Sequence, residues 1–334
     1  MVTIALTGDV MLGRGVNEEL RKMRPEEPWC DVLPLMLGGN GHREVDLRII
    51  NLECALTTRL QPWTRTSKVF HFRADPSAVS VLQAARIDAC SLANNHTLDY
   101  EEEGLLDTLR HLESAGIQHA GAGKDERDAA RPAILRAGQE GTRVGLVAVT
   151  DNELPFAAGA HRPGTHYLPV SMETEVLRHV EEAVGMARAG GAEIVIFSNH
   201  WGPNMVMRPS RLFQEFAHAV IDRGADLYYG HSAHLFQGVE IYRGKPILYD
   251  TGDFIDDYAV DPVLRNDWSF LFVATLERGT FQRLEMHPVV LSYARVSRAA
   301  GSEREAIQER MECLSAELGT PLRRAEQHLV MEPG

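Results

Sequence analysis

Short apolar runs alternate along this chain with longer stretches in which apolar residues recur every three or four positions. The short runs are rich in β-branched residues and bounded by turn residues, which predicts strands, whereas the longer stretches have the spacing of amphipathic helices. We expect strands at residues 2–7, 47–51, 87–92, 143–149, 193–198, 227–229 and 247–249, and helices at residues 76–85, 103–115, 171–189 and 209–223. This alternation is typical of an α/β domain.

The remaining pattern predicts a long loop, a hairpin and a C-terminal helix. Residues 151–169 contain prolines and glycines without a period, and loops of this length often act as lids. The stretch from Asp267 predicts a hairpin that turns at Arg278-Gly279, and Ser302 with Glu305 predicts a capping box that begins a helix. We therefore expect one domain over residues 1–295, followed by a C-terminal helix and tail over residues 296–334.

The composition narrows the class of protein. The 334 residues are 44% hydrophobic and 24% charged, which are ordinary values for a chain with a large core. A net charge of −13 argues against binding to nucleic acid or an anionic membrane. The four cysteines show no paired spacing, and no signal peptide or membrane span is visible, so we expect a cytoplasmic protein with reduced thiols. The pattern does not indicate an oligomeric state.

Five polar clusters that follow predicted strands carry side chains able to bind metal. Each cluster alone has a structural explanation, because Asp9 could be a turn residue and His200 a buried core histidine. In an open α/β sheet, however, the carboxyl ends of the strands meet at one crevice, so we expect the five clusters to converge. The clusters are Gly8-Asp9, Asn51-Leu52-Glu53, Asn94-Asn95-His96, residues 198–202 around His200, and residues 230–234 with His231 and His234.

The chemistry of these side chains favours a dinuclear hydrolase. Carboxylate, amide and imidazole ligands without a thiolate suit divalent ions such as Mn²⁺, Zn²⁺ or Fe²⁺. A carboxylate that bridges two such ions activates a water molecule and neutralises an anionic transition state.

Five stretches of sequence resemble one protein family. GDVMLGRGV at 8–16, NLECALT at 51–57, SLANNHTLDY at 91–100, SNHWG at 198–202 and residues 224–254 resemble the bacterial CapA-type poly-γ-glutamate (capsule) synthesis proteins, within the calcineurin-like metallophosphoesterase superfamily. The resemblance runs from Thr3 to Asp257. It implies an α/β fold, a four-layer αββα sandwich with the metal site at the strand ends, here followed by a C-terminal helical appendage.

The same resemblance implies individual roles. It makes Asp9 and His234 ligands of the first metal, His200 and His231 ligands of the second, Glu53 the bridging carboxylate and Asn95 an amide ligand. It places His96 against the phosphate or its transition state, and we expect Asp99 to orient His96.

Two departures from the superfamily pattern concern the first metal. Met11 stands where a histidine ligand is usual, so we expect this ion to be weakly bound or of a different kind. The usual GHHPH reads GHSAH, and the usual GNF reads GDF with Asp253. The acidic residues Asp253, Asp256 and Asp257 either supply a replacement ligand or form a solvated turn.

A basic stretch follows Glu53. Residues 54–74 contain Arg59, Arg65, Lys68, His71 and Arg73 but no acidic residue. The stretch either balances acidic helices nearby or recognises an anion, in which case Lys68, Arg73 and Arg14 would bind an anionic small molecule or a glutamyl polymer.

Three functions stay open at this point. We favour a metal-dependent hydrolase of phosphoesters or glutamyl amides. The alternatives are a non-catalytic accessory protein of poly-γ-glutamate or capsule biosynthesis, and a metal- or anion-binding module whose site has degenerated at Met11.

Overall fold

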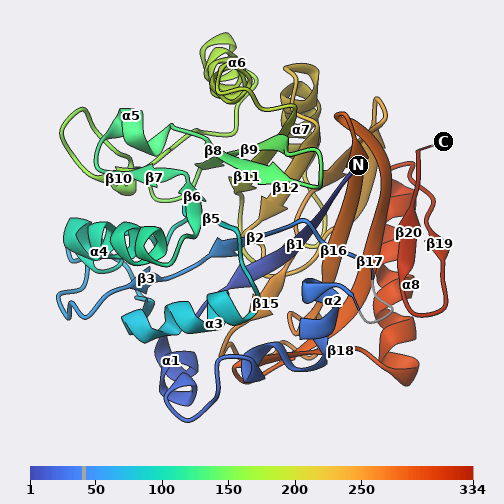
Figure 1. Ribbon diagram of the computed structural model, residues 1–334, viewed down its shortest axis with the longest axis horizontal. Coiled ribbons are helices and arrows are strands. Elements are labelled where there is room, and N and C mark those ends of the chain that lie inside the picture. Colours follow the sequence, from blue (N-terminus) through green and yellow to red (C-terminus); the bar gives the residue numbers. More distant parts are fainter. Residues whose placement is uncertain (40–42, 334) are drawn as a thin grey trace.

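Two β-sheets lie face to face at the centre of the molecule (Figure 1). The computed structural model describes residues 1–39 and 43–333. The first sheet has ten strands, with the order β19-β20-β17-β16-β1-β2-β5-β6, while β15 pairs with β1 and β18 with β17. The second sheet has six strands, with the order β13-β14-β12-β11-β9-β8. Strands β1, β2, β5 and β6 are parallel, as are β9, β11, β12 and β14, so each sheet has a parallel centre.

The strands of the first sheet are β1 (Val2–Val10), β2 (Leu47–Leu52), β5 (Ala89–Ser91), β6 (Gln118–Ala120), β15 (Asp253–Ile255), β16 (Trp268–Glu277), β17 (Thr280–Ser292), β18 (Arg295–Arg298), β19 (Arg323–Arg324) and β20 (Leu329–Met331). Those of the second are β8 (Ala133–Ala137), β9 (Thr142–Thr150), β11 (Ile194–His200), β12 (Leu227–His231), β13 (Val239–Tyr242) and β14 (Lys245–Leu248). Two small ladders join β3 (Ala55–Leu56) to β4 (Arg73–Ala74), and β7 (Ala122–Gly123) to β10 (Gly164–Thr165).

The apolar runs form strands that are buried on both faces. In β11, Ile194 and Ile196 pack into the core between the sheets, whereas Val195 and Phe197 pack into the outer core. In β1, Leu6 likewise faces the second sheet. Side chains of a strand alternate between its two faces, so continuous apolar runs need cover on both sides.

Helices supply that cover. Outside the first sheet lie α1 (Arg14–Leu20), η1 (Glu27–Val32), α2 (Leu33–Leu37), η2 (Pro76–Ala78), α3 (Val79–Ala84) and α4 (Glu101–Ser114). Outside the second lie α6 (Thr174–Ala189) and α7 (Arg211–Asp222). Figure 1 shows α6 and α7 above the sheets and α1 and α3 below them. The predicted four-layer αββα sandwich is therefore confirmed.

The C-terminal region packs along one edge of this sandwich. Ile307, Met311 and Leu314 of α8 (Gly301–Glu317) belong to the core between the sheets, and β20 extends the first sheet. The division into residues 1–295 and 296–334 stays a prediction. The hairpin is confirmed, with Arg278 and Gly279 at φ 49° and 78° in its turn. The capping box is wrong, because α8 begins at Gly301 and no side chain caps it.

The segment 151–169 is irregular, as predicted, apart from the short helix η3 (Leu154–Phe156) and β10; its role as a lid stays a prediction. Helix α5 (Glu126–Ala129) lies beside β7 and β10. Within residues 1–39 and 43–333, no helix is both long and apolar enough to cross a membrane.

Candidate metal centre

Strands of both sheets end at one place and bring the predicted ligands together. Asp9, His200 and His231 lie within the last residues of β1, β11 and β12, not in the loops after them, because the ladders run further than the apolar pattern suggests. His200 pairs directly with His231 across the second sheet, and Asp9 pairs with Asn51 in the first. The convergence thus follows from the register of the strands.

Gly8 allows a further segment to approach Asp9. A Cβ on Gly8 would lie 2.1 Å from the carbonyl oxygen of Gly252, so only glycine fits here. This contact lets the backbone N–H of Asp9 donate to the same carbonyl at 2.8 Å, and places Asp253 opposite Asp9 in the β1–β15 pair. Asp253 reaches the site through this pairing.

The first donor group contains three carboxylates and one imidazole. Ligand atoms of Asp9, Glu53, His234 and Asp253 all lie within 4.8 Å of one another. The Nδ1 atom of His234 is 2.8 Å from Oδ1 of Asp253, and the Tyr258 hydroxyl donates to Oε2 of Glu53 at 3.2 Å. These contacts hold the ring of His234 and the carboxylate of Glu53 in place.

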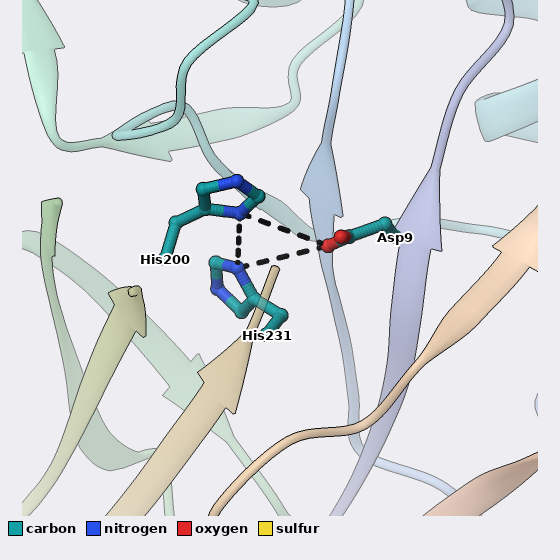
Figure 2. A group of neighbouring side chains, drawn as sticks. All are labelled: Asp9, His200 and His231. Atoms are coloured by element: carbon teal, nitrogen blue, oxygen red, sulfur yellow. Dashed lines mark hydrogen bonds and ion pairs between the residues drawn. The ribbon is translucent and has the colours of Figure 1, made fainter. Parts of the chain in front are cut away.

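The second donor group contains Asp9, His200 and His231 (Figure 2). The two Nδ1 atoms of the histidines are 2.9 Å apart and lie 4.0 and 3.7 Å from Oδ1 of Asp9. The hydroxyl of Ser198 contacts Nε2 of His231 at 2.8 Å and so keeps its Nδ1 facing Asp9. Asp9 is common to both groups, whereas the family resemblance gives the bridging position to Glu53, whose Oε1 is 3.9 Å from Nε2 of His200.

Several buried polar atoms at this centre have no hydrogen-bond partner. They are Oδ2 of Asp9, Oε1 of Glu53, Nε2 of His200 and Oδ2 of Asp253. A buried polar atom left unpaired costs about 1–3 kcal/mol, so such a concentration is unfavourable unless a ligand completes it. Carboxylate oxygens and neutral imidazole nitrogens are donors that suit a divalent cation, and the residues present therefore fit one.

The charges of the site support the same conclusion. Burial, together with the charges of Glu53 and Asp253, raises the pKa of Asp9 well above its usual value, and burial raises the pKa of Glu53 to about 7. Burial lowers the pKa of His200 and brings that of His231 to about 3, so both rings are neutral. Burial alone would lower the pKa of His234, but the carboxylates, Asp253 foremost, raise it well above its usual value. A cation would relieve this crowding of negative charge.

Met11 and Asp253 account for the departures seen in the sequence. Met11 is fully buried in the apolar cluster under the first sheet, and its sulfur accepts the N–H of Gly13 at 3.0 Å. Asp253 is also fully buried and provides a fourth donor to the first group. The solvated-turn interpretation is therefore wrong for Asp253. Asp256 and Asp257 instead accept backbone N–H groups of Tyr258 and Gly15.

His96 faces the centre from the next loop. Its Nδ1 is 2.6 Å from Oδ2 of Asp99, which also accepts the N–H of Phe72 at 2.6 Å. The ring stacks on Phe72 with centroids 3.7 Å apart, and its Nε2 is 3.9 Å from Oε1 of Glu53. Burial raises the pKa of Asp99 to about 7 and lowers that of His96. Asp99 is thus placed to orient His96.

The two asparagines before His96 differ in role. Asn94 donates to Oδ1 of Asn51 and to the carbonyl of Leu52 at 3.0 and 2.9 Å, and Asn51 donates to Asp9 at 2.8 Å. Asn94 and Asn51 therefore fix the strand ends. The Oδ1 atom of Asn95 is buried without a partner. The sequence did not predict that Asn51 and Tyr258 would hydrogen-bond to Asp9 and Glu53. Asn51 belongs to one of the five polar clusters, whereas no sequence pattern marks Tyr258.

The basic stretch is largely neutralised by acidic residues. Arg59 pairs with Asp107 at 3.6 Å, and Arg65 with Glu101 and Glu102 at 2.7 and 2.9 Å. The guanidinium of Arg73 donates to Thr57 and Asp75, which supports the structural interpretation for these three arginines.

Two of the predicted substrate-binding residues line a pocket of about 490 Å³ beside the centre. Lys68 lies 2.7 Å from the carbonyl of Asn95, 3.4 Å from Asp99 and 3.5 Å from Glu153. Arg14 lies 3.3 Å from Asp257. Among the residues described, Arg73 does not line this pocket.

A family model and two curated relatives place this chain in one family. Residues 3–258 match the model of the bacterial capsule synthesis protein family PGA_cap. A probable polyglutamine synthesis accessory protein of Mycobacterium tuberculosis is 34% identical, covering 96% of this chain and 92% of that protein. The capsule biosynthesis protein CapA of Bacillus anthracis is 28% identical, covering 77% and 60%. A solved 5'-nucleotidase of Candida albicans is 8% identical with a TM-score of 0.47, covering 96% of this chain and 59% of that one.

Proposed function

Because this chain belongs to the bacterial capsule synthesis protein PGA_cap family, we propose that it is a hydrolase that uses two divalent metal ions on an anionic phosphoester or glutamyl-amide substrate. The observation that carries the proposal is the pair of donor groups that share Asp9 and contain unpaired buried atoms. Donors that are buried, unpaired and crowded with negative charge are poorly explained by folding alone.

The two groups assign the ligands. Asp9, Glu53, His234 and Asp253 would hold one ion, and Asp9, His200 and His231 the other, with Asn95 adjoining them. When bound, such ions supply an acidified water molecule and neutralise charge that develops on the substrate. Mn²⁺, Zn²⁺ and Fe²⁺ all suit these donors.

His96 would act on the substrate itself. Its Nδ1 is held by Asp99, so its Nε2 stays directed toward the side of the centre that carries Glu53. With Asp99 protonated and donating to Nδ1, Nε2 carries the N–H of the ring, and from there His96 can stabilise a developing negative charge or give a proton to the leaving atom. The stack on Phe72 and the N–H that Phe72 donates to Asp99 keep both partners in this orientation.

Metal content and turnover test the proposal together. We expect the purified protein, after loading with Mn²⁺ or Zn²⁺, to bind two ions and to hydrolyse bis-p-nitrophenyl phosphate. His200→Ala and His231→Ala should lose at least one ion and most of the activity. His218→Ala is a matched control, because His218 pairs with Glu240 away from the centre. A protein that binds no divalent metal under any loading condition would refute the proposal.

A second candidate is a non-catalytic accessory role in poly-glutamate or capsule assembly, with a glutamyl polymer as partner. The name of the mycobacterial relative favours it. A complementation experiment separates the two candidates, because only the accessory role predicts that a His96→Ala protein restores polymer production fully. Asp253 argues against the alternative of a degenerate binding module, because its carboxylate supplies a donor in place of the histidine that is usual at the position of Met11. The cytoplasmic location stays a prediction that cell fractionation can test.

A further inference from the structure

The pocket beside the metal centre has an aromatic wall. Its volume is about 490 Å³, and His96 and His234 line its inner end. Phe70, Phe72 and Tyr258 line its side, with the rings of Phe70 and Phe72 6.5 Å apart and inclined by 30°. Pockets of this size hold a ring system or a short acyl chain, and their apolar walls contribute most of the affinity.

The pocket also has an apolar rim. Val69 and Phe70, which line the pocket, are 82% and 58% exposed. Large apolar side chains grouped next to a candidate site, and open to solvent, indicate a surface that is covered when its ligand binds.

The cationic groups that line the pocket are already paired. Arg14 lies 3.3 Å from Asp257, and its guanidinium is 5.5–5.8 Å from the ring centres of Phe70, Phe72 and Tyr258. Lys68, with its side chain only 6% exposed, lies between Asp99 and Glu153.

His234 also lines the pocket, but it belongs to the first donor group, where it faces the carboxylates of Glu53 and Asp253. Among the residues described at the pocket, no positive charge is therefore left for a second or third anionic group. A chain with a carboxylate on every unit would bring negative charges that this wall cannot pair.

We propose that the substrate is a phosphoester with a single anionic group and an aromatic or other apolar leaving group. This inference rests on the proposed function and specifies its substrate class. The phosphoryl group would lie at the metal centre, and the leaving group between Phe70, Phe72 and Tyr258. In the reaction the oxygen of water bonds to phosphorus, the phosphorus–oxygen bond to the leaving group breaks, and a proton passes to the leaving oxygen, giving phosphate and an apolar alcohol or phenol.

A ratio of specificities tests this inference. The metal-loaded protein and its Phe70→Ala variant are each assayed for phosphate release from 1-naphthyl phosphate and from methyl phosphate. We take kcat/KM for the naphthyl ester divided by kcat/KM for the methyl ester, and compare this quotient between the two proteins. The intrinsic reactivity of the two leaving groups then cancels.

We expect the quotient to fall about tenfold in Phe70→Ala, the lower end of what small apolar groups in a pocket contribute, with methyl phosphate unaffected. Phe70 is largely exposed, so the variant should fold. Leu212→Ala, which alters an exposed leucine on α7, is the matched control and should leave the quotient unchanged.

The outcomes separate this inference from the proposed function. An unchanged quotient with both esters hydrolysed overturns the substrate class alone, as does faster cleavage of a γ-glutamyl oligomer than of the naphthyl ester. Absence of metal-dependent turnover of both esters overturns this inference alone if the protein still hydrolyses bis-p-nitrophenyl phosphate or a γ-glutamyl oligomer. Absence of metal-dependent hydrolysis of all these substrates overturns the proposed function, and this inference with it.

Discussion

Replacing Asp253 by asparagine should weaken one metal site without unfolding the protein. The substitution keeps the size of the side chain, and an amide oxygen can still accept a hydrogen bond from His234, now 2.8 Å from Oδ1. It removes one of the three carboxylates in the first donor group. In the metal-free protein the charge of Asp253 raises the pKa of both Asp9 and Glu53, so its removal relieves repulsion there.

The expected changes in metal affinity and in stability follow from the number of ligands and from the coupling of metal binding to folding. Even residues that only support a metal ligand change affinity by about 10–100-fold, so losing a direct ligand should weaken this site at least about 100-fold. At a metal concentration about 1,000 times the dissociation constant, binding stabilises the folded protein by about 4.1 kcal/mol. With a dissociation constant about 100 times larger the gain falls to about 1.4 kcal/mol. We expect the metal-induced rise in Tm to shrink by about 5 °C.

Calorimetry with and without metal measures this difference. Asp253→Asn should unfold in EDTA at or above the wild-type temperature, lose most of the rise in Tm on adding Mn²⁺, and bind one ion tightly in a titration. Asp256→Asn is the control, because it removes a buried carboxylate close by that accepts the N–H of Tyr258 and lies outside the donor group. If both variants bind two ions with wild-type affinity, or lose affinity equally, Asp253 is not a ligand.

Two further predictions concern the scaffold. Leu314 lies in the core between the sheets, so Leu314→Ala should lower the free energy of unfolding, measured in urea, by about 2–5 kcal/mol. The control Leu212→Ala, at an exposed position, should change it by less than about 0.5 kcal/mol. Equal effects of the two substitutions would mean that α8 does not belong to the core. Burial alone would raise the pKa of Glu285, but His287 and neighbouring arginines, Arg283 among them, lower it to about 2. Because the pKa of Glu285 in the folded protein lies below the usual 4.5, Glu285→Gln should lower the free energy of unfolding by about 1–2 kcal/mol above pH 4.5. This difference between the two proteins should vanish as the pH falls toward 2. A difference that does not depend on pH would contradict the ion pairing.

The strands were the most predictable part of the fold. β1, β2, β9 and β11 are rich in apolar residues at successive positions because both of their faces are buried. The helices α1, α2 and η1 left no such pattern. All three are short, and α2 and η1 contain prolines. They depend on tertiary contacts, such as the hydrogen bond from the indole of Trp29 to the carbonyl of Val81. Local sequence therefore could not specify them.

The basic stretch shows a second limit. Its net positive charge in sequence was compatible with either anion binding or charge balance, and in the structure Arg59 and Arg65 find their partners on α4, more than thirty residues away. Lys68 likewise reaches Glu153 in the loop after β9. Charge balance is a property of the folded surface, so a local excess of cations in the sequence is weak evidence for a binding site.

The absence of a histidine at Met11 is balanced by the carboxylate of Asp253, so the site need not be degenerate. Both positions belong to the contact between β1 and β15: the N–H of Met11 donates to the carbonyl of Ile255, and Asp253 pairs with Asp9. The chain thus lacks a ligand on one strand and gains a carboxylate on its neighbour, which keeps four donors in the first group. The sequence left open whether Asp253 is this ligand, because the pairing that decides it joins residues more than 240 positions apart and depends on the close approach of Gly8 to Gly252. The carboxylate of Asp253 also affects the chemistry: the first group offers mainly oxygen donors and the second mainly imidazole nitrogens, so metal ions bound to the two groups would differ in kind.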